Sequence, residues 1–107
     1  MSDSNHHHLI LYFARYLEND REVIEAIQLF GQSFQLENSS WQFTMLDLHQ
    51  FCSEQIHSIK NLNYSSFKQL IYQNPTNQLL RDHGGQFEVF LNSGKIKKTI
   101  YCLNRIQ

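Results

Sequence analysis

The chain has 107 residues, of which 41 % are apolar, 13 % aromatic and 18 % charged, with a formal net charge of −1. This composition can build the core of one folded domain and excludes a disordered or acidic tail protein. No apolar run approaches the roughly 18 residues of a membrane span, and the first residues lack the pattern of a secretory signal, so we expect neither. Cys52 and Cys102 do not form a CxxC pair, and we expect reduced, buried thiols and a cytoplasmic location.

The near-zero net charge hides an asymmetry between the two halves of the chain. Residues 1–57 hold two basic and eight acidic residues, a net charge of −6, whereas residues 58–107 hold seven basic and two acidic residues, a net charge of +5. Such a split indicates a surface that faces a polyanion, or two halves that attract each other or a neighbouring subunit.

The N-terminal third is expected to form two helices. The first, about residues 8–18, has a helical stripe of apolar residues and is interrupted at Asn19-Asp20. Asp20 is a suitable N-cap for a second helix, Arg21 to Phe34. The apolar face of this second helix consists of Val23, Ile27, Phe30 and Phe34.

The middle of the chain combines a loop, a short strand and more helices. Residues 36–40 read as a polar loop, and Trp41-Gln42-Phe43 as a short strand or a packing anchor. Thr44 is expected to cap a helix over residues 44–57, and Ser65 or Ser66 the next one. Pro75 should end that helix near Gln73, although a continuous, kinked helix is the alternative. A further helix would run from Thr76 to His83 and end at Gly84-Gly85.

Two apolar runs near the C-terminus predict a β-hairpin. Phe87 to Leu91 and Ile96 to Leu103 are rich in β-branched and aromatic residues, and Asn92-Ser93-Gly94-Lys95 supplies the turn. The expected fold class is α+β, with four to five helices and a C-terminal β-hairpin that the strand at residues 41–43 would extend. We expect one domain over residues 1–107, with an acidic helical extension (1–36) and a core (44–103).

The order helix, turn, helix, glycine and lysine-tipped hairpin over Thr44–Leu103 resembles a winged helix-turn-helix domain. This resemblance implies a DNA-binding transcription regulator whose recognition helix enters the major groove and whose hairpin is the wing. A homodimer on a two-fold operator would fit that role. The residues implied to contact double-stranded DNA are Ser66, Lys68, Thr76, Asn77, Gln78, Arg81, Lys95, Lys97 and Lys98.

Each of these positions also has a purely structural interpretation. Asn77 and Gln78 are common as cap and surface residues, and the three hairpin lysines could be a solvated edge. The alternative function is a non-enzymatic protein-binding module of the immunity, inhibitor or adaptor type, using the acidic residues Glu18, Asp20, Glu22 and Glu25. Protein interfaces are also enriched in aromatic side chains such as Tyr12, Tyr16, Trp41 and Tyr72, but we expect each of these four in or near the core.

Metal binding and catalysis receive little support from the sequence. His6-His7-His8 is compact, but His49 and His57 are about two helical turns apart. HExxH, CxxC, GxSxG and phosphate-binding glycine motifs are all missing from the sequence. We expect no metal, no cofactor and no enzymatic activity.

Overall fold

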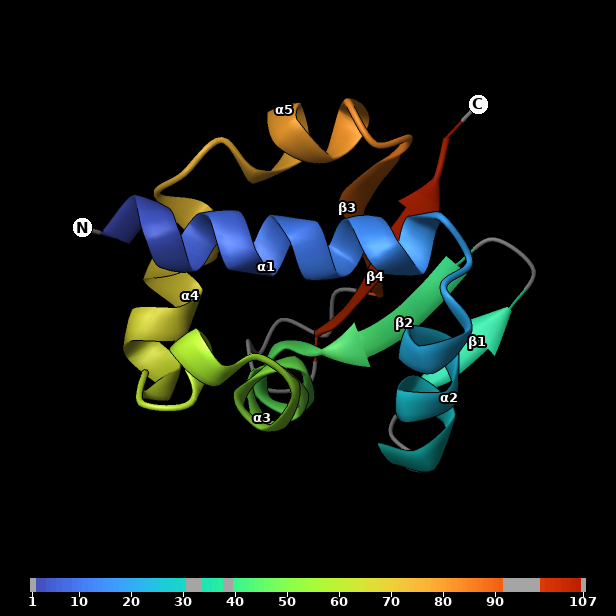
Figure 1. Cartoon of the computed structure of the whole chain (residues 1–107). Coiled ribbons are helices and arrows are strands. Elements are labelled where there is room, and N and C mark those ends of the chain that lie inside the picture. Colours follow the sequence, from blue (N-terminus) through green and yellow to red (C-terminus); the bar gives the residue numbers. More distant parts are fainter. Residues whose placement is uncertain (1, 31–33, 38–39, 92–98, 107) are drawn as a thin grey trace.

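The fold is α+β, as predicted: a four-stranded sheet with helices on it (Figure 1). The computed structural model describes residues 2–30, 34–37, 40–91 and 99–106. The strands pair antiparallel in the order β1-β2-β4-β3. Their bounds are β1 Gln35–Glu37, β2 Ser40–Thr44, β3 Gly85–Leu91 and β4 Ile100–Arg105.

The longest helix, α1, crosses the sheet and has α4 near its start and α2 near its end (Figure 1). At about 1.5 Å per residue, its 16 residues keep these two helices well apart. Within the described ranges, no helix is both long and apolar enough to cross a membrane. The helices are α1 Ser2–Leu17, α2 Arg21–Phe30, α3 Met45–Gln55, the 3-10 turn η1 His57–Ile59, α4 Tyr64–Tyr72 and α5 Thr76–Arg81.

The two N-terminal helices form as predicted but with different ends. The first helix begins at Ser2 and therefore also contains His6 and His7, which precede its expected start at His8. Asp20 caps α2 as predicted, because its Oδ1 accepts the N–H of Glu22 at 3.0 Å. The second helix ends at Phe30, so Phe34 lies beyond it, yet Phe34 is buried in the core at 8 % exposure.

The region predicted as a polar loop, residues 36–40, overlaps strand β1. Leu36 pairs with Trp41 across the β1–β2 ladder and packs against the core, which a purely polar loop would not do. The predicted strand at residues 41–43 is confirmed, and its ladder with β4 adds β2 to the C-terminal hairpin. The sequence does not predict β1, because three residues are too few to show the alternation of apolar and polar residues that marks a strand.

The helix boundaries in the middle of the chain test two predictions about caps and one about a break at Pro75. Thr44 caps α3 as expected, since its Oγ1 accepts the N–H of Asp47 at 3.2 Å. The cap of α4 is Asn63, whose Oδ1 accepts the N–H of Ser66 at 2.8 Å, so the prediction of Ser65 or Ser66 was wrong. The chain is broken at Pro75 into two helices, α4 and α5, and is not one kinked helix.

Two glycines connect α5 to the hairpin. Gly84 has φ +83°, the left-handed conformation predicted for this position, and its carbonyl accepts the N–H of Ile106 at 2.8 Å. A Cβ on Gly85 would lie 2.5 Å from Cδ1 of Leu17, so a glycine lets β3 start directly against α1. The hairpin itself is confirmed by the β3–β4 ladder. Its predicted turn, Asn92 to Lys95, lies outside the described residues.

The core is an aromatic layer between α1, α3 and the sheet. Trp41 is fully buried and its ring contacts those of Phe13 and Phe43 edge-on, with centroids 6.1 and 5.1 Å apart. Phe51 from α3 closes the layer at 5.7 Å from Trp41. Rings in this arrangement gain beyond their area burial, by about 0.5–1.5 kcal/mol per pair.

Candidate nucleic-acid interface

The two helical residues Thr76 and Asn77, predicted to contact bases, anchor α5 to the rest of the fold. The Thr76 hydroxyl donates to the carbonyl of Ile71 at 2.7 Å and lies 2.9 Å from Nε2 of His6 on α1. Because the hydroxyl proton is used on Ile71, we assign the Nε2–H of His6 as donor to Thr76. Thr76 is 6 % exposed, so its hydroxyl is engaged inside the protein.

Asn77 ties the other side of α5 to the edge of the sheet. Its Oδ1 accepts the N–H of Phe87 at 2.7 Å, and its Nδ2 donates to the Phe87 carbonyl at 3.2 Å. The amide thereby acts as a short strand partner for the outer edge of β3 and covers polar groups that an edge would otherwise expose.

Of the four predicted recognition residues, Thr76, Asn77, Gln78 and Arg81, the last two are exposed to solvent. Nε of Arg81 donates to Oε1 of Gln86 at 3.3 Å. A bond between two exposed side chains is readily exchanged for another partner. Gln78 and Arg81 therefore remain the predicted base-contacting residues of α5 that can reach a ligand.

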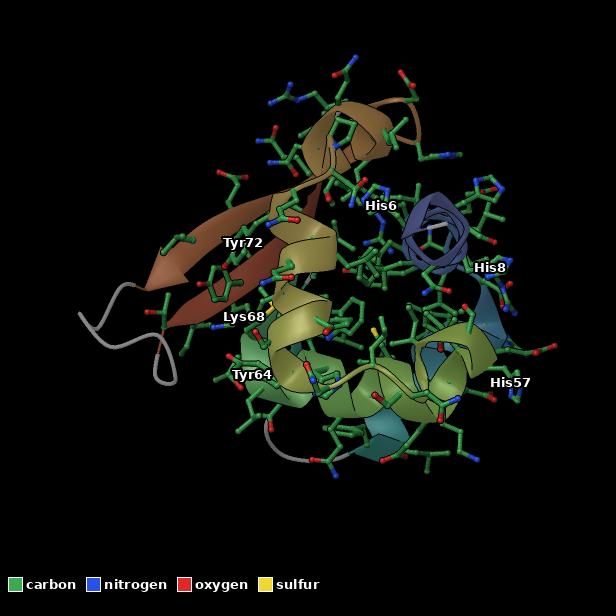
Figure 2. The ribbon with its side chains drawn as sticks, turned by 90° about the vertical axis from the view of Figure 1, so that its left-hand side faces the viewer. His6, His8, His57, Tyr64, Lys68 and Tyr72 are labelled. Carbon is green, nitrogen blue, oxygen red and sulfur yellow. The ribbon has the colours of Figure 1, made fainter. Side chains whose placement is uncertain are left out.

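The structure separates the two α4 residues predicted to contact phosphate. Ser66 and Lys68 are two positions apart, which places them on different faces of the helix. Ser66 borders a hollow beside Asn5 and Gln73, whereas Lys68 lies in line with Tyr64 and Tyr72 along the visible face of α4 (Figure 2). The predicted wing residues Lys95, Lys97 and Lys98 lie outside the described residues.

A pocket of about 420 Å³ brings α4, α5 and the hairpin together. Tyr72 on α4 is 59 % exposed, and its Oη donates to Oη of Tyr101 on β4 at 3.0 Å. Burial of the hydroxyl, followed by this hydrogen bond, raises the pKa of Tyr72. The walls include Ile71, Tyr72, Gln78, Val89 and Tyr101.

Tyr64 and Tyr101 belong to this surface, although the sequence placed neither of them in a site. The signal for Tyr64 was present, since Tyr64, Lys68 and Tyr72 recur every four residues, the spacing of one helix face. No local sequence pattern links Tyr101 to this surface, because it is 29 residues from Tyr72 in the chain.

The acidic residues of the alternative site gather at the junction of α1 and α2. Arg15 partly neutralises them, with Nε 2.9 Å from Oδ2 of Asp20 and Nη2 3.6 Å from Oε2 of Glu22. The hydrogen bond from Arg15 lowers the pKa of Asp20. Glu18 and Glu25 are exposed. This junction lies at the far end of α1 from α4, so these carboxylates are separated from Lys68 (Figure 1). The basic residue Arg105 lies at the junction, where its Nη2 donates to the carbonyl of Tyr16 at 3.0 Å.

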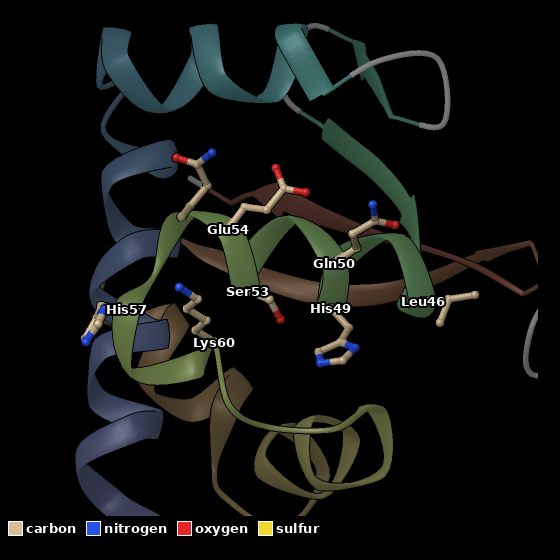
Figure 3. Close-up of a pocket in the computed structure, with 8 residues that line it drawn as sticks. Leu46, His49, Gln50, Ser53, Glu54, His57 and Lys60 are labelled. Atoms are coloured by element: carbon tan, nitrogen blue, oxygen red, sulfur yellow. The ribbon is translucent and has the colours of Figure 1, made fainter.

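A second, open groove of about 870 Å³ runs along α3 (Figure 3). His49 and His57 line it but lie apart, with Ser53 and Lys60 between them (Figure 3). Nε2 of His49 is 2.7 Å from the carbonyl of Leu62, which occupies one ring nitrogen. In the part of the chain that the structure describes, no three His, Cys, Asp or Glu residues are grouped to hold a metal ion.

Both cysteines are free and buried, and burial raises the pKa of the Cys52 thiol. A buried thiol with a raised pKa is a poor nucleophile, because the thiolate is the reactive form.

Comparisons with protein-family models, with curated proteins and with solved structures found no significant match to this chain.

Proposed function

We propose that this protein binds nucleic acid, as a DNA-binding regulator, through the surface that α4, α5 and the β3–β4 hairpin share. The observation that carries the proposal is the separation of charge along α1: the acidic junction is at one end, and Lys68 is at the other (Figures 1 and 2). A duplex approaching the α4 side meets Lys68 without passing the acidic cluster. Phosphate contacts supply most of the nonspecific affinity of such proteins.

Within this surface, the residues have different roles. Lys68 and the hairpin lysines Lys95, Lys97 and Lys98 would neutralise phosphates, as the resemblance to winged helix-turn-helix domains implies. Gln78 and Arg81 are exposed on α5 and are of types that pair with adenine and guanine edges. Thr76 and Asn77 would support the interface from behind, because their side chains are bonded to α1, α4 and β3. The buried thiols of Cys52 and Cys102 accord with a cytoplasmic location.

The test is a titration of a labelled random duplex of about 25 base pairs, followed by fluorescence anisotropy at about 50 and 200 mM salt. Affinity should fall steeply with salt, and Lys97→Glu with Lys98→Glu should abolish binding while the fold is retained. Lys68→Glu should lower the salt slope by about one unit per lost phosphate contact.

Lys60→Glu is the matched control for that titration. Lys60 lines the α3 groove and not the pocket shared by α4, α5 and the hairpin. The same charge change there should alter affinity much less than Lys68→Glu. If wild-type protein fails to bind duplex at low salt, or if Lys60→Glu and Lys68→Glu weaken binding equally, this surface is not an interface for duplex DNA.

A second candidate function uses the acidic face, and the exposure of Leu29 favours it. Leu29 is 85 % exposed and follows Glu22 and Glu25 on the outer face of α2, at positions three and four residues apart. An exposed leucine beside carboxylates fits a partner that has a small apolar hollow with a basic rim. Under this alternative, Glu22→Lys with Glu25→Lys should abolish partner binding and leave duplex binding intact.

A further inference from the structure

The outer face of α4 carries an alternating aromatic and basic row. Tyr64, Lys68 and Tyr72 succeed each other along the helix beside β3 and β4 (Figure 2). Nζ of Lys68 lies 4.9 Å from the centroid of the Tyr64 ring, which directs the cation along the helix surface. Lys68 is the only cation among the described residues that lies over a ring of this row.

The hydroxyl of Tyr72 is fixed by a hydrogen bond, while its ring is exposed to solvent. Its Oη is bonded to Tyr101, whose position in β4 is set by the ladders to β2 and β3. With 59 % of the residue exposed, much of the ring surface is open to solvent. An aromatic ring fixed at its polar end loses little conformational entropy when a ligand stacks on it.

The surroundings of Tyr72 suit a planar ligand with polar edges. Val89, 55 % exposed, and Tyr101 form the apolar side of the adjoining pocket, and Gln78 adds an amide. Glu88 also borders the pocket, but its side chain lies on the sheet face of Cys102 and Asn104. Its Oε2 accepts from Nδ2 of Asn104 at 2.6 Å.

We propose that Tyr72 is a stacking platform for an unpaired nucleobase and that Lys68 contacts the neighbouring phosphate, so that this surface binds single-stranded nucleic acid. The inference rests on the proposed nucleic-acid function and narrows its ligand. Bases inside a duplex stack on each other and present only their edges, whereas an unpaired base offers a face to an exposed ring.

Proline-rich peptides also pack on tyrosine rings, but the charges favour a polyanion. The helix that carries the row, α4, contains Lys68 and no acidic residue. An uncharged peptide would gain nothing from Lys68, and its binding would hardly change with salt. A single strand of nucleic acid would gain from both the tyrosine ring and Lys68, because it carries bases and phosphates.

The decisive experiment compares fluorescein-labelled oligothymidine and oligouridine of about 15 nucleotides with a duplex of the same length. The single strands should bind more tightly than the duplex, and the two single strands distinguish DNA from RNA. Tyr72→Ala should weaken single-strand binding about 5- to 150-fold, as expected for one lost base stack, and should change duplex binding less than twofold. Tyr72→Phe keeps the ring and should stay within a few-fold of wild type.

Leu46→Ala is the matched control, because it removes an exposed apolar side chain on α3, outside this pocket, and should leave the affinities for duplex and single strands unchanged. A second measurement does not depend on any variant: 2-aminopurine in the centre of the strand should lose fluorescence when it stacks on the wild-type protein. Unquenched 2-aminopurine in a bound strand, or equal loss of duplex and single-strand binding in Tyr72→Ala, overturns the inference while the proposed function stands.

Two further outcomes separate the hypotheses. If wild-type protein binds neither duplex nor single strands, the proposed function fails and this inference fails with it. If a labelled proline-rich peptide binds more tightly than the oligonucleotides and its affinity is insensitive to salt, the row is a peptide site and the inference is also wrong.

Discussion

The chain uses aromatic residues in two contrasting ways. In the core, Trp41 meets Phe13, Phe43 and Phe51 ring against ring at centroid distances of 5.1 to 6.1 Å. On the surface, Tyr72 and Tyr101 meet through their hydroxyls, 3.0 Å apart. The first arrangement hides the rings and stabilises the fold. The second fixes the polar ends and leaves ring surface for a ligand.

Residue type alone does not tell which aromatic residues pack in the core and which lie on the surface. From the sequence, Tyr12, Tyr16, Trp41 and Tyr72 are all expected in or near the core. The first three are 8, 1 and 0 % exposed, as expected, but Tyr72 is 59 % exposed. Replacing a ring by alanine distinguishes the two groups. A core ring should cost mainly stability, and the surface ring of Tyr72 should cost mainly binding.

The largest effect is expected for Trp41→Ala. Nε1 of Trp41 is buried without a hydrogen-bond partner among the described residues, which costs about 1–3 kcal/mol. Burial of the large ring outweighs this cost, and its removal should destabilise the protein by about 3–5 kcal/mol in urea denaturation. Tyr72→Ala should cost less than about 1 kcal/mol. Comparable losses in the two variants would remove the distinction between core and surface rings.

Thr76→Val tests whether the helix beside the surface depends on a buried hydroxyl. The substitution keeps the shape but leaves the Ile71 carbonyl and the ring nitrogen of His6 without their Thr76 partner. We expect a loss of about 1–3 kcal/mol in the free energy of unfolding. Thr76→Ser retains the hydroxyl and is the control, so equal losses in both would assign the effect to packing.

The predictions that succeeded rest on local signals. Asp20 and Thr44 cap helices whose first N–H groups lie two or three residues away, and Pro75 breaks a helix through its own ring. What sequence reasoning missed depends on partners far along the chain. Thr76 bonds to His6, 70 residues earlier, and Asn77 bonds to the backbone of Phe87. The sequence predicts both as ligand contacts, because nothing near them in the chain reveals those partners.

Alkaline pH should distinguish a core tyrosine from its phenylalanine variant. Burial, with a smaller effect from Cys52, raises the pKa of Tyr12 to about 12 from its usual value of 10.0. A folded-state pKa above the unfolded one gives stability that is complete below about pH 10 and is lost as pH rises through the folded value.

Tyr12→Phe removes that loss. Urea midpoints of wild type and Tyr12→Phe, measured from about pH 8 to 11, should stay at a constant difference up to about pH 9 and then shift in favour of the variant. Parallel curves across the whole range would mean that the Tyr12 phenol ionises in the folded protein as readily as in the unfolded chain.

The smallest effect is expected for Tyr64→Phe, and its sign is the informative part. The hydroxyl of Tyr64 is buried and has no hydrogen-bond partner among the described residues, so removing it relieves a desolvation cost. The ring over which Lys68 lies is kept. Urea denaturation should show stability unchanged or raised by up to about 1 kcal/mol, since an unsatisfied group contributes nothing favourable. Tyr72→Phe, which deletes a made hydrogen bond, should change stability in the opposite direction. A clear loss of stability in Tyr64→Phe would mean that the Tyr64 hydroxyl is hydrogen-bonded, as the hydroxyls of Tyr72 and Tyr101 are.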